Sequence, residues 1–335
     1  MNLPRPDAGH TFRSGRPFKQ VDVFTAQPYL GNPLAVVLDS TGLDEAEMQR
    51  LARWTNLSET AFLLPPSPAA RAAGADYRVR IFTPGGELPF AGHPTLGSCH
   101  AWLEAGGVPQ VAHGIVQECG VGLVRLRRSA QTPGLLAFAA PPLKRSNPGP
   151  MQLAQIAAAL GLKAHHIITA QLLDNGPVWL GLLLDSPATV LALNPDQAAL
   201  KALGYKIGVA GLSPSCEADA PQGVQLIARS SREARAFGGH SGRQPHAVDS
   251  EAAQPELEVR AFAPSEGISE DPVTGSFNAS LAQWLIADGH APQRYLVSQG
   301  TCLGRAGRVH IERDADGQVW VGGASVTCVE GLVRL

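Results

Sequence analysis

The architecture of this chain is predicted by one segment, Arg80-Ile-Phe-Thr-Pro-Gly-Gly-Glu-Leu-Pro-Phe-Ala-Gly-His-Pro-Thr-Leu-Gly97. Residues 79–83 predict a strand, the Pro-Gly-Gly sequence predicts a turn, and a helix is expected to open at Pro94 or Thr95. Much of this pattern returns as Arg260-Ala-Phe-Ala-Pro-Ser-Glu-Gly-Ile-Ser-Glu-Asp-Pro-Val-Thr-Gly-Ser276. Two copies of one strand–turn–helix unit indicate a duplicated domain rather than a solenoid.

Composition excludes several classes of function. With 335 residues, 44% of them hydrophobic, the chain can bury a substantial core and form about two domains. A net charge of −2 and 6% aromatic residues favour neither nucleic-acid binding nor base stacking. The N-terminus lacks a signal-like apolar run, and no apolar run approaches the ~20 residues of a membrane span. Five scattered cysteines without a CxxC pair indicate reduced thiols and no zinc cage. We therefore expect a cytoplasmic protein without a metal.

The domain organisation follows from the repeat. We expect an N-terminal extension over 1–18, a first half over 19–140 and a second half over 141–335, whose last strand could return to the first half. The boundary is predicted at 141–150, which holds four prolines. Residues 65–75, rich in Pro and Ala, predict a loop, and residues 230–254 predict a long surface loop. Many short strands around one central helix per half predict an α+β fold, not a doubly wound sheet or a TIM barrel.

The two predicted helix openings are the first candidate site. The first turn of a helix carries unpaired backbone N–H groups and partial positive charge, which suit a carboxylate or phosphate. If the halves are related by a pseudo-twofold axis, the openings at 94–97 and 274–276 face each other across a cleft. In that arrangement we expect the two openings to hold a small anionic ligand. The alternative is a pair of ordinary capped helices.

Three titratable side chains lie near these openings. Glu59 follows Ser58 just before an apolar strand, so burial would raise its pKa and suit it to act as a general base. Otherwise it is a solvated loop acid. His93 precedes the first helix, where a neutral imidazole could contact a substrate. Asp271 precedes Pro272, a position typical of an N-cap or Asx turn.

Several strings in the chain resemble those of the phenazine-biosynthesis isomerase family, which shares its fold with diaminopimelate epimerase. The matches run in order from about Val21 to Leu335. They are Val21-Asp-Val-Phe-Thr25, Gly31-Asn-Pro33, Asn56-Leu-Ser-Glu-Thr60, Ala91-Gly-His-Pro-Thr95, Glu270-Asp-Pro-Val-Thr-Gly-Ser276, Ser298-Gln-Gly300 and Gly322-Gly323.

The resemblance implies two similar halves, each a sheet curled around a central helix, with the active site between them. It also implies a homodimer that uses no metal or organic cofactor. Glu59 would take a proton from a carbon beside an unsaturated or carbonyl group and return it elsewhere on the same face. The catalytic residues it implies are Glu59, His93 and Asp271. The substrate-binding residues it implies are Ser58, Gly92, Thr95, Thr274, Gly275 and Ser276.

Two features depart from the family pattern. The epimerase branch has a cysteine at each helix mouth, but those positions here fall near Ala91 and at 271–272, and Cys99 lies further along its helix. Racemisation by two thiols is therefore not expected. Phe277-Asn278 replaces the small residue and histidine of many relatives. Because one fold can serve different substrates, the substrate need not belong to the phenazine pathway.

The sequence thus predicts a cofactor-independent isomerase that acts by proton transfer on a small carboxylate-bearing metabolite. One alternative is a non-catalytic protein of the same fold that binds a small anion. Another is an amino-acid epimerase or racemase that uses carboxylate bases.

Overall fold

The computed structural model describes residues 15–111, 114–129, 132, 134–213 and 254–335. The loop predicted over 230–254 therefore lies, except for Gln254, outside the described residues. The elements up to residue 140 are β1 (Arg16–Val23), β2 (Asn32–Val37), α1 (Glu45–Thr55), β3 (Thr60–Leu64), α2 (Pro68–Ala72), β4 (Tyr77–Phe82), β5 (Glu87–Leu88), α3 (Gly92–Glu104), β6 (Ile115–Cys119), β7 (Gly122–Arg128) and β8 (Leu136–Ala139). The later elements are β9 (Lys144–Ser146), α4 (Pro150–Ala159), β10 (Ile167–Asp174), β11 (Val178–Leu184), α5 (Pro187–Ala192), α6 (Gln197–Leu203), β12 (Lys206–Leu212), β13 (Leu257–Ala263), β14 (Ile268–Asp271), α7 (Gly275–Ala287), β15 (Arg294–Gln299), β16 (Gly307–Arg313), β17 (Val319–Gly323) and β18 (Ser325–Val333).

The strand pairings repeat from the first half to the second. In the first half β2 pairs in parallel with β3, β3 pairs antiparallel with β4, and β4 also pairs in parallel with β6. In the second half β11, β12, β13 and β15 pair in the same order and directions. The expected α+β fold of two similar halves is thus confirmed.

The matching hairpins carry matching side-chain contacts. The guanidinium of Arg80 on β4 binds the carboxylate of Glu87 at 2.6 Å, and that of Arg260 on β13 binds Glu270 at 2.8 Å. Each guanidinium also lies 5.1 Å from the ring centroid of the phenylalanine two residues later. The Arg-x-Phe repeat of the sequence therefore has one structural role in both halves.

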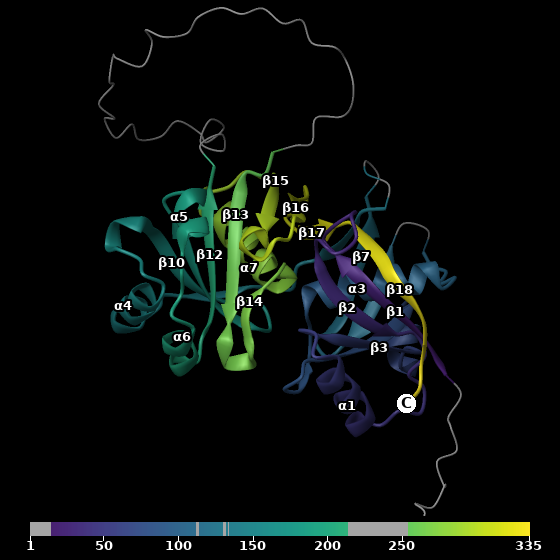
Figure 1. Cartoon of the computed structure of the whole chain (residues 1–335). Helices are drawn as coiled ribbons and strands as arrows, with labels where there is room; N and C mark the ends of the chain where they lie inside the picture. Colours follow the sequence, from purple (N-terminus) through teal and green to yellow (C-terminus); the bar gives the residue numbers. More distant parts are fainter. Residues whose placement is uncertain (1–14, 112–113, 130–131, 133, 214–253) are drawn as a thin grey trace, which may run out of the picture.

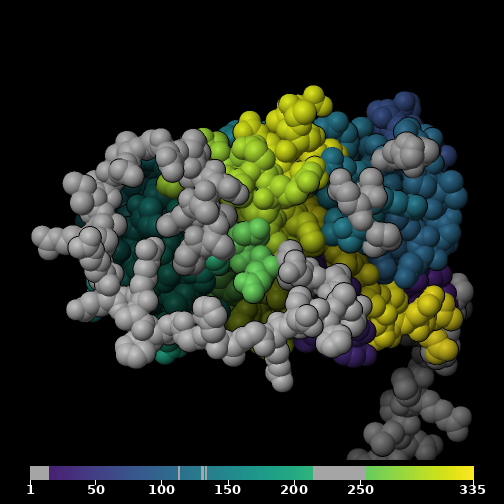
Figure 2. Space-filling model, turned by 90° about the horizontal axis from the view of Figure 1, so that it is seen from above, coloured from purple at the N-terminus to yellow at the C-terminus, as the bar shows by residue number. Residues whose placement is uncertain are grey.

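Strands from distant parts of the chain join the halves. β8 pairs antiparallel with β17, and β18 pairs antiparallel with β1, so the C-terminal strand (yellow) lies beside the N-terminal strand (purple) in Figure 1, and yellow atoms adjoin purple ones in Figure 2. The short strand β9 pairs with β10 of the second half. The first three residues of β1, 16–18, lie inside the extension predicted over 1–18, because Arg16 already pairs with Val333 of β18.

Each half is built around one central helix. In Figure 1, α3 lies among the strands of the first half and α7 among those of the second. Most residues of both helices are buried, including Leu96 and Trp284, so each helix is enclosed by its half rather than lying on the surface. Helix α3 begins at Gly92, earlier than predicted, because Pro94 fits the first turn, where a missing N–H breaks no intrahelical bond.

Two short elements occupy segments predicted as connections. Helix α2 lies within 65–75 because the Ser67 side chain accepts a hydrogen bond from the Ala70 N–H, and Pro68 opens its first turn. Strand β9 lies within the predicted boundary at 141–150. No helix in the described part of the chain is long and apolar enough to cross a membrane.

The first turns of α3 and α7 are in direct backbone contact. A Cβ atom added to Gly92 would lie 2.6 Å from the carbonyl carbon of Gly275, and one added to Gly275 would lie 2.8 Å from that of Gly92. Backbone atoms cannot move aside as a flexible side chain can. Glycine at both positions therefore permits the two helix openings to meet at the seam between the halves.

We expect Gly92→Ala and Gly275→Ala each to lower the free energy of unfolding by about 1–3 kcal/mol or more, because the added methyl group overpacks a backbone contact. Urea denaturation of the full chain measures the change. Gly331→Ala is the control, since a Cβ at that position of β18 meets no atom within 4 Å. Equal stability of Gly92→Ala and Gly331→Ala would contradict the close contact.

Candidate active site

Glu59 is placed by the end of helix α1. Asn56 caps this helix in the left-handed conformation, with φ of 54°, and turns the chain so that Glu59 precedes β3. The Glu59 side chain is only 14% exposed, so it is not a solvated loop acid. Burial raises its pKa to about 7, against the opposing effects of the Ser58 hydroxyl and the Lys206 ammonium group. Its Oε2 atom has no hydrogen-bond partner among the described residues.

His93 lies in the first turn of α3 and faces Glu59. Its Nδ1 atom is 3.5 Å from Glu59 Oε2, and the side chain is 3% exposed. Burial lowers its pKa to about 4, although the nearby carboxylate of Asp271 raises it. The imidazole is therefore neutral at pH 7, chiefly because burial penalises its charged form. Its Nε2 atom has no hydrogen-bond partner in the described part of the chain.

Asp271 ends strand β14 on the opposite side of the seam. Its Oδ1 atom accepts a hydrogen bond from Asn32 Nδ2 at 2.9 Å, and its Oδ2 atom accepts one from the Thr274 hydroxyl at 2.6 Å. Burial, together with the negative charge of Glu59, raises the pKa of Asp271 to about 6. The donors Thr274 and Asn32 oppose this shift.

Asn32 connects these residues across the seam. Besides Asp271, its Nδ2 atom donates to the Val273 carbonyl oxygen at 2.9 Å and lies 3.5 Å from His93 Nδ1. Two predicted residues from the first half and one from the second thus converge on one buried cluster of Glu59, His93, Asp271 and Asn32, which we call the Glu59 cluster. Such convergence of perturbed titratable groups is typical of an active site.

The other predicted residues from the helix openings border this cluster. Neither N-cap residue, Ala91 or Thr274, caps its helix with a side chain, so the first turns at Gly92 and Gly275 keep backbone N–H groups for other acceptors. The Ser276 hydroxyl accepts a hydrogen bond from Trp179 Nε1 at 3.2 Å. The Ser58 hydroxyl donates to Asn32 Oδ1 at 3.4 Å.

The hydroxyl groups of two predicted substrate-binding residues bind protein atoms in this structure. Thr95 is fully buried, donates to the Ala91 carbonyl oxygen at 2.9 Å and accepts from Gln117 Nε2 at 3.1 Å, so it faces the interior of the first half. The Thr274 hydroxyl is turned to Asp271. A β-hydroxyl in or beside the first helical turn readily bonds nearby polar groups of the protein.

Sequence reasoning did not assign roles to Asn32 and Gln299. The Gln299 amide bonds the backbone N–H of Thr274 at 3.0 Å and the Thr274 hydroxyl at 2.9 Å. Both residues lie within strings that signalled the family, Gly31-Asn-Pro33 and Ser298-Gln-Gly300, so the signal was present in the sequence.

Phe277 and Asn278, which differ from the family pattern, both make contacts within the second half. The Phe277 ring lies over Gly208, where an added Cβ would come 2.1 Å from it, and packs 5.4 Å from the ring of Trp179. Asn278 Nδ2 donates to Gln299 Oε1 at 2.8 Å. Phe277 therefore fills core space, whereas Asn278 supports the network around Asp271.

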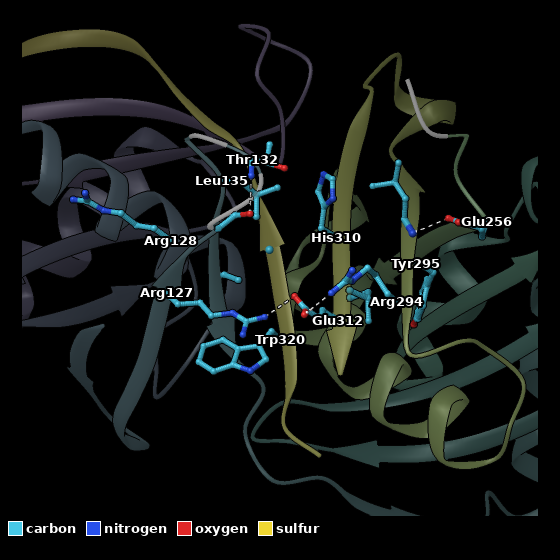
Figure 3. A pocket seen from close by; sticks show the side chains of 15 residues that line it. Arg127, Arg128, Thr132, Leu135, Glu256, Arg294, Tyr295, His310, Glu312 and Trp320 are labelled. Atoms are coloured by element: carbon cyan, nitrogen blue, oxygen red, sulfur yellow. Dashed lines mark hydrogen bonds and ion pairs between the residues drawn. The ribbon is translucent and has the colours of Figure 1, made fainter. Parts of the chain in front are cut away.

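An open groove of about 600 Å³ lies elsewhere on the seam, across β7, β8 and β15 to β17 (Figure 3). Within it Arg127 and Arg294 both bind the Glu312 carboxylate, at 2.6 and 2.8 Å. None of its lining residues belongs to the Glu59 cluster, so the groove is separate from the candidate active site.

The described residues offer no group of three or more His, Cys, Asp or Glu side chains arranged to hold a metal ion. The chemistry that this arrangement can perform is proton transfer. A buried carboxylate with a pKa near neutrality can both accept and return a proton at pH 7.

Comparison with known proteins identifies relatives across almost the whole chain. The family model of the phenazine biosynthesis-like proteins, PhzC-PhzF, matches residues 21–331. Antisense-enhancing sequence 1 of Schizosaccharomyces pombe is 33% identical over 94% of this chain and 97% of its own length. The trans-2,3-dihydro-3-hydroxyanthranilate isomerase of Pseudomonas aeruginosa is 30% identical over 94% of this chain and 98% of its own length.

A solved structure supports the fold. The Bacillus anthracis phenazine biosynthesis protein of the PhzF family superposes with a TM-score of 0.72 at 20% identity, covering 96% of this chain and 100% of that one. Together with the duplicated α+β architecture, these matches show that the chain belongs to the phenazine biosynthesis-like protein family, whose relatives include isomerases.

Proposed function

We propose that this protein is a cofactor-independent isomerase that moves a proton on a small carboxylate-bearing metabolite, with Glu59 as the proton carrier. The observation that carries the proposal is the state of Glu59. Its carboxyl group is buried at the seam, its pKa is raised to about 7, and its Oε2 atom has no hydrogen-bond partner among the described residues. Such a group is suited to exchange a proton with a substrate.

The helix openings supply the anion site in this proposal. The first turns of α3 and α7 contact each other at Gly92 and Gly275, which brings two partially positive helix ends together. A substrate carboxylate beside them accepts backbone N–H hydrogen bonds and relieves this repulsion. The carboxylate is thereby fixed next to Glu59 and His93.

The proposed reaction has two proton transfers. Ionised Glu59 removes a proton from a substrate carbon, the C–H electron pair forms a new double bond to the neighbouring carbon, and the electron pair of the old double bond moves to its far carbon. Protonated Glu59 then returns the proton to the carbon at the far end of the shifted system, so no atoms or electrons are gained or lost. Neutral His93 hydrogen-bonds to the substrate and polarises it.

The relative from Pseudomonas aeruginosa suggests the first substrate to test. At 30% identity over nearly the full chain, its printed activity on trans-2,3-dihydro-3-hydroxyanthranilate makes that cyclic dihydro-acid the natural probe. Phe277 and Asn278 depart from the common pattern in the helix beside the site, so related dihydro-acids should be tested in parallel.

We expect Glu59→Gln to reduce isomerisation of this probe by about 10²–10⁴-fold, because the amide cannot accept the proton. Turnover in heavy water, followed by proton NMR, should show deuterium entering the product with the native chain and not with the variant. Glu330→Gln is the matched control, since its side chain on β18 is 73% exposed and lies outside the Glu59 cluster.

Two outcomes would count against the proposal. Unchanged turnover in Glu59→Gln would exclude Glu59 as the carrier. Tight binding of the dihydro-acids by the native chain without deuterium exchange would instead favour the non-catalytic anion-binding alternative. Interconversion of amino-acid enantiomers in heavy water tests the racemase alternative.

The pH dependence of kcat/KM follows from the raised pKa of Glu59. The base must be ionised in the free enzyme, so log kcat/KM should rise with a slope of about one up to about pH 7 and then level off. Initial rates between pH 5 and 9, with circular dichroism to verify folding, measure the profile. A profile that is flat down to pH 5 would be incompatible with Glu59 as the base.

The free energy of unfolding should also depend on pH because of the raised pKa of Glu59. Because the pKa of Glu59 is raised from 4.5 to about 7 on folding, its stabilising contribution is full below pH 4.5 and is lost as pH rises through 7. Glu59→Gln removes this dependence. The free energy of unfolding of the variant minus that of the native chain should therefore increase by about 2–3 kcal/mol from pH 5 to pH 8, as measured by urea denaturation. A constant difference would indicate that Glu59 is not buried in solution.

A further inference from the structure

We propose that Gln299 and Thr274 are positioning residues that hold Asp271 as an unprotonated carboxylate, so that the proton moved in the reaction is carried by Glu59 alone. That Glu59 alone carries the proton rests on the proposed function. That Gln299 and Thr274 hold Asp271 unprotonated follows from the hydrogen-bond network of the second half.

The orientation of the Gln299 amide is fixed by two backbone groups. Its Oε1 atom lies 3.0 Å from the backbone nitrogen of Thr274, which can only donate. Its Nε2 atom lies 3.2 Å from the carbonyl oxygen of Asp271, which can only accept. Exchanging the amide oxygen and nitrogen would break both contacts, so the side chain has one chemically consistent orientation.

Asn278 reinforces this orientation. Its Nδ2 atom donates to Gln299 Oε1 at 2.8 Å and to the Thr274 carbonyl oxygen at 2.9 Å. The second contact identifies this atom as the amide nitrogen, because the carbonyl oxygen cannot donate. Gln299 is fully buried, so no water competes for its amide.

The fixed amide determines the direction of the Thr274 hydroxyl. Gln299 Nε2 donates to Thr274 Oγ1 at 2.9 Å, so the oxygen accepts there and its own hydrogen points elsewhere. The Asp271 Oδ2 atom lies 2.6 Å away, a distance typical of a hydroxyl that donates to a carboxylate. Oδ2 therefore accepts this hydrogen and does not carry one.

The other oxygen of Asp271 is engaged in the same way. Oδ1 accepts from Asn32 Nδ2 at 2.9 Å, and that atom is identified as nitrogen because it also donates to the Val273 carbonyl oxygen. Both oxygens of Asp271 thus face donors whose direction is set by backbone groups. Hydrogen bonds of this kind favour the charged form of a carboxyl group.

Glu59 lies in a contrasting environment. Its Oε2 atom has no hydrogen-bond partner among the described residues and lies 3.5 Å from His93 Nδ1, so this oxygen can take up a proton without displacing a donor. The titratable groups acting on Asp271 are Glu59 and the neutral His93, and those acting on Glu59 include Lys206 and Glu266. Two nearby carboxyl groups in unlike surroundings therefore take different roles.

The test is a carbon-13 NMR titration of the full chain with labelled Asp and Glu side-chain carboxyl groups, assigned with Asp271→Asn and Glu59→Gln. In the native chain Asp271 should titrate at lower pH than Glu59. Thr274→Val removes the hydroxyl at nearly constant shape and should raise the Asp271 midpoint by about one unit or more, whereas Thr274→Ser should leave it in place. Gln299→Met keeps the Thr274 hydroxyl but removes the amide that orients it. This variant should raise the Asp271 midpoint by a smaller amount.

A native chain in which Asp271 is protonated while Glu59 is ionised would overturn the proposal, as would an Asp271 midpoint that is unchanged in both Thr274→Val and Gln299→Met. A purely structural role would lower stability without moving the midpoint. No substrate enters this titration, so its result is independent of whether Glu59→Gln abolishes turnover, and the two proposals fail separately.

Discussion

The backbone contact between the first turns of α3 and α7 is the constraint on which the site depends. It brings together two helices that are each the core of a separate half, and it does so at the ends where both carry positive partial charge. His93 lies within one of these turns, and Asp271 lies four residues before Gly275, the first residue of the other helix. How the two halves meet therefore decides that His93 and Asp271 lie in one cluster.

Dehydration at this seam gives the cluster its chemistry. Burial alone would favour the neutral form of every group in it, and His93 responds in that way. The two carboxyl groups differ because only Asp271 receives two well-aligned donors, from Asn32 and Thr274. Small differences in local hydrogen bonding thus separate two acids that share the same low-dielectric surroundings.

Much of the fold could be predicted from the sequence because duplication leaves a strong signal. The repeated Arg-x-Phe strand and the helix after it are local features, and both were recognised. The family strings also led to Glu59, His93 and Asp271. The proximity of the residues in the Glu59 cluster could not be derived from their spacing in the sequence. Asn32 and Asp271, for example, are 239 positions apart and meet only through tertiary structure. The direction of the Thr95 hydroxyl, which bonds Gln117 in the interior, could not be predicted either, because sequence does not show which side of a helix turn faces the core.

The pairing of β18 with β1 has a consequence for synthesis. The strands of the first half leave the ribosome before those of the second, yet one edge of the first half is covered only by Ser325–Val333. That edge therefore stays open until β18 has been synthesised, although domains generally fold as they emerge. Until then the nascent protein presents the unpaired side of β1, whose Lys19 and Asp22 place charge on a strand that other chains could otherwise join.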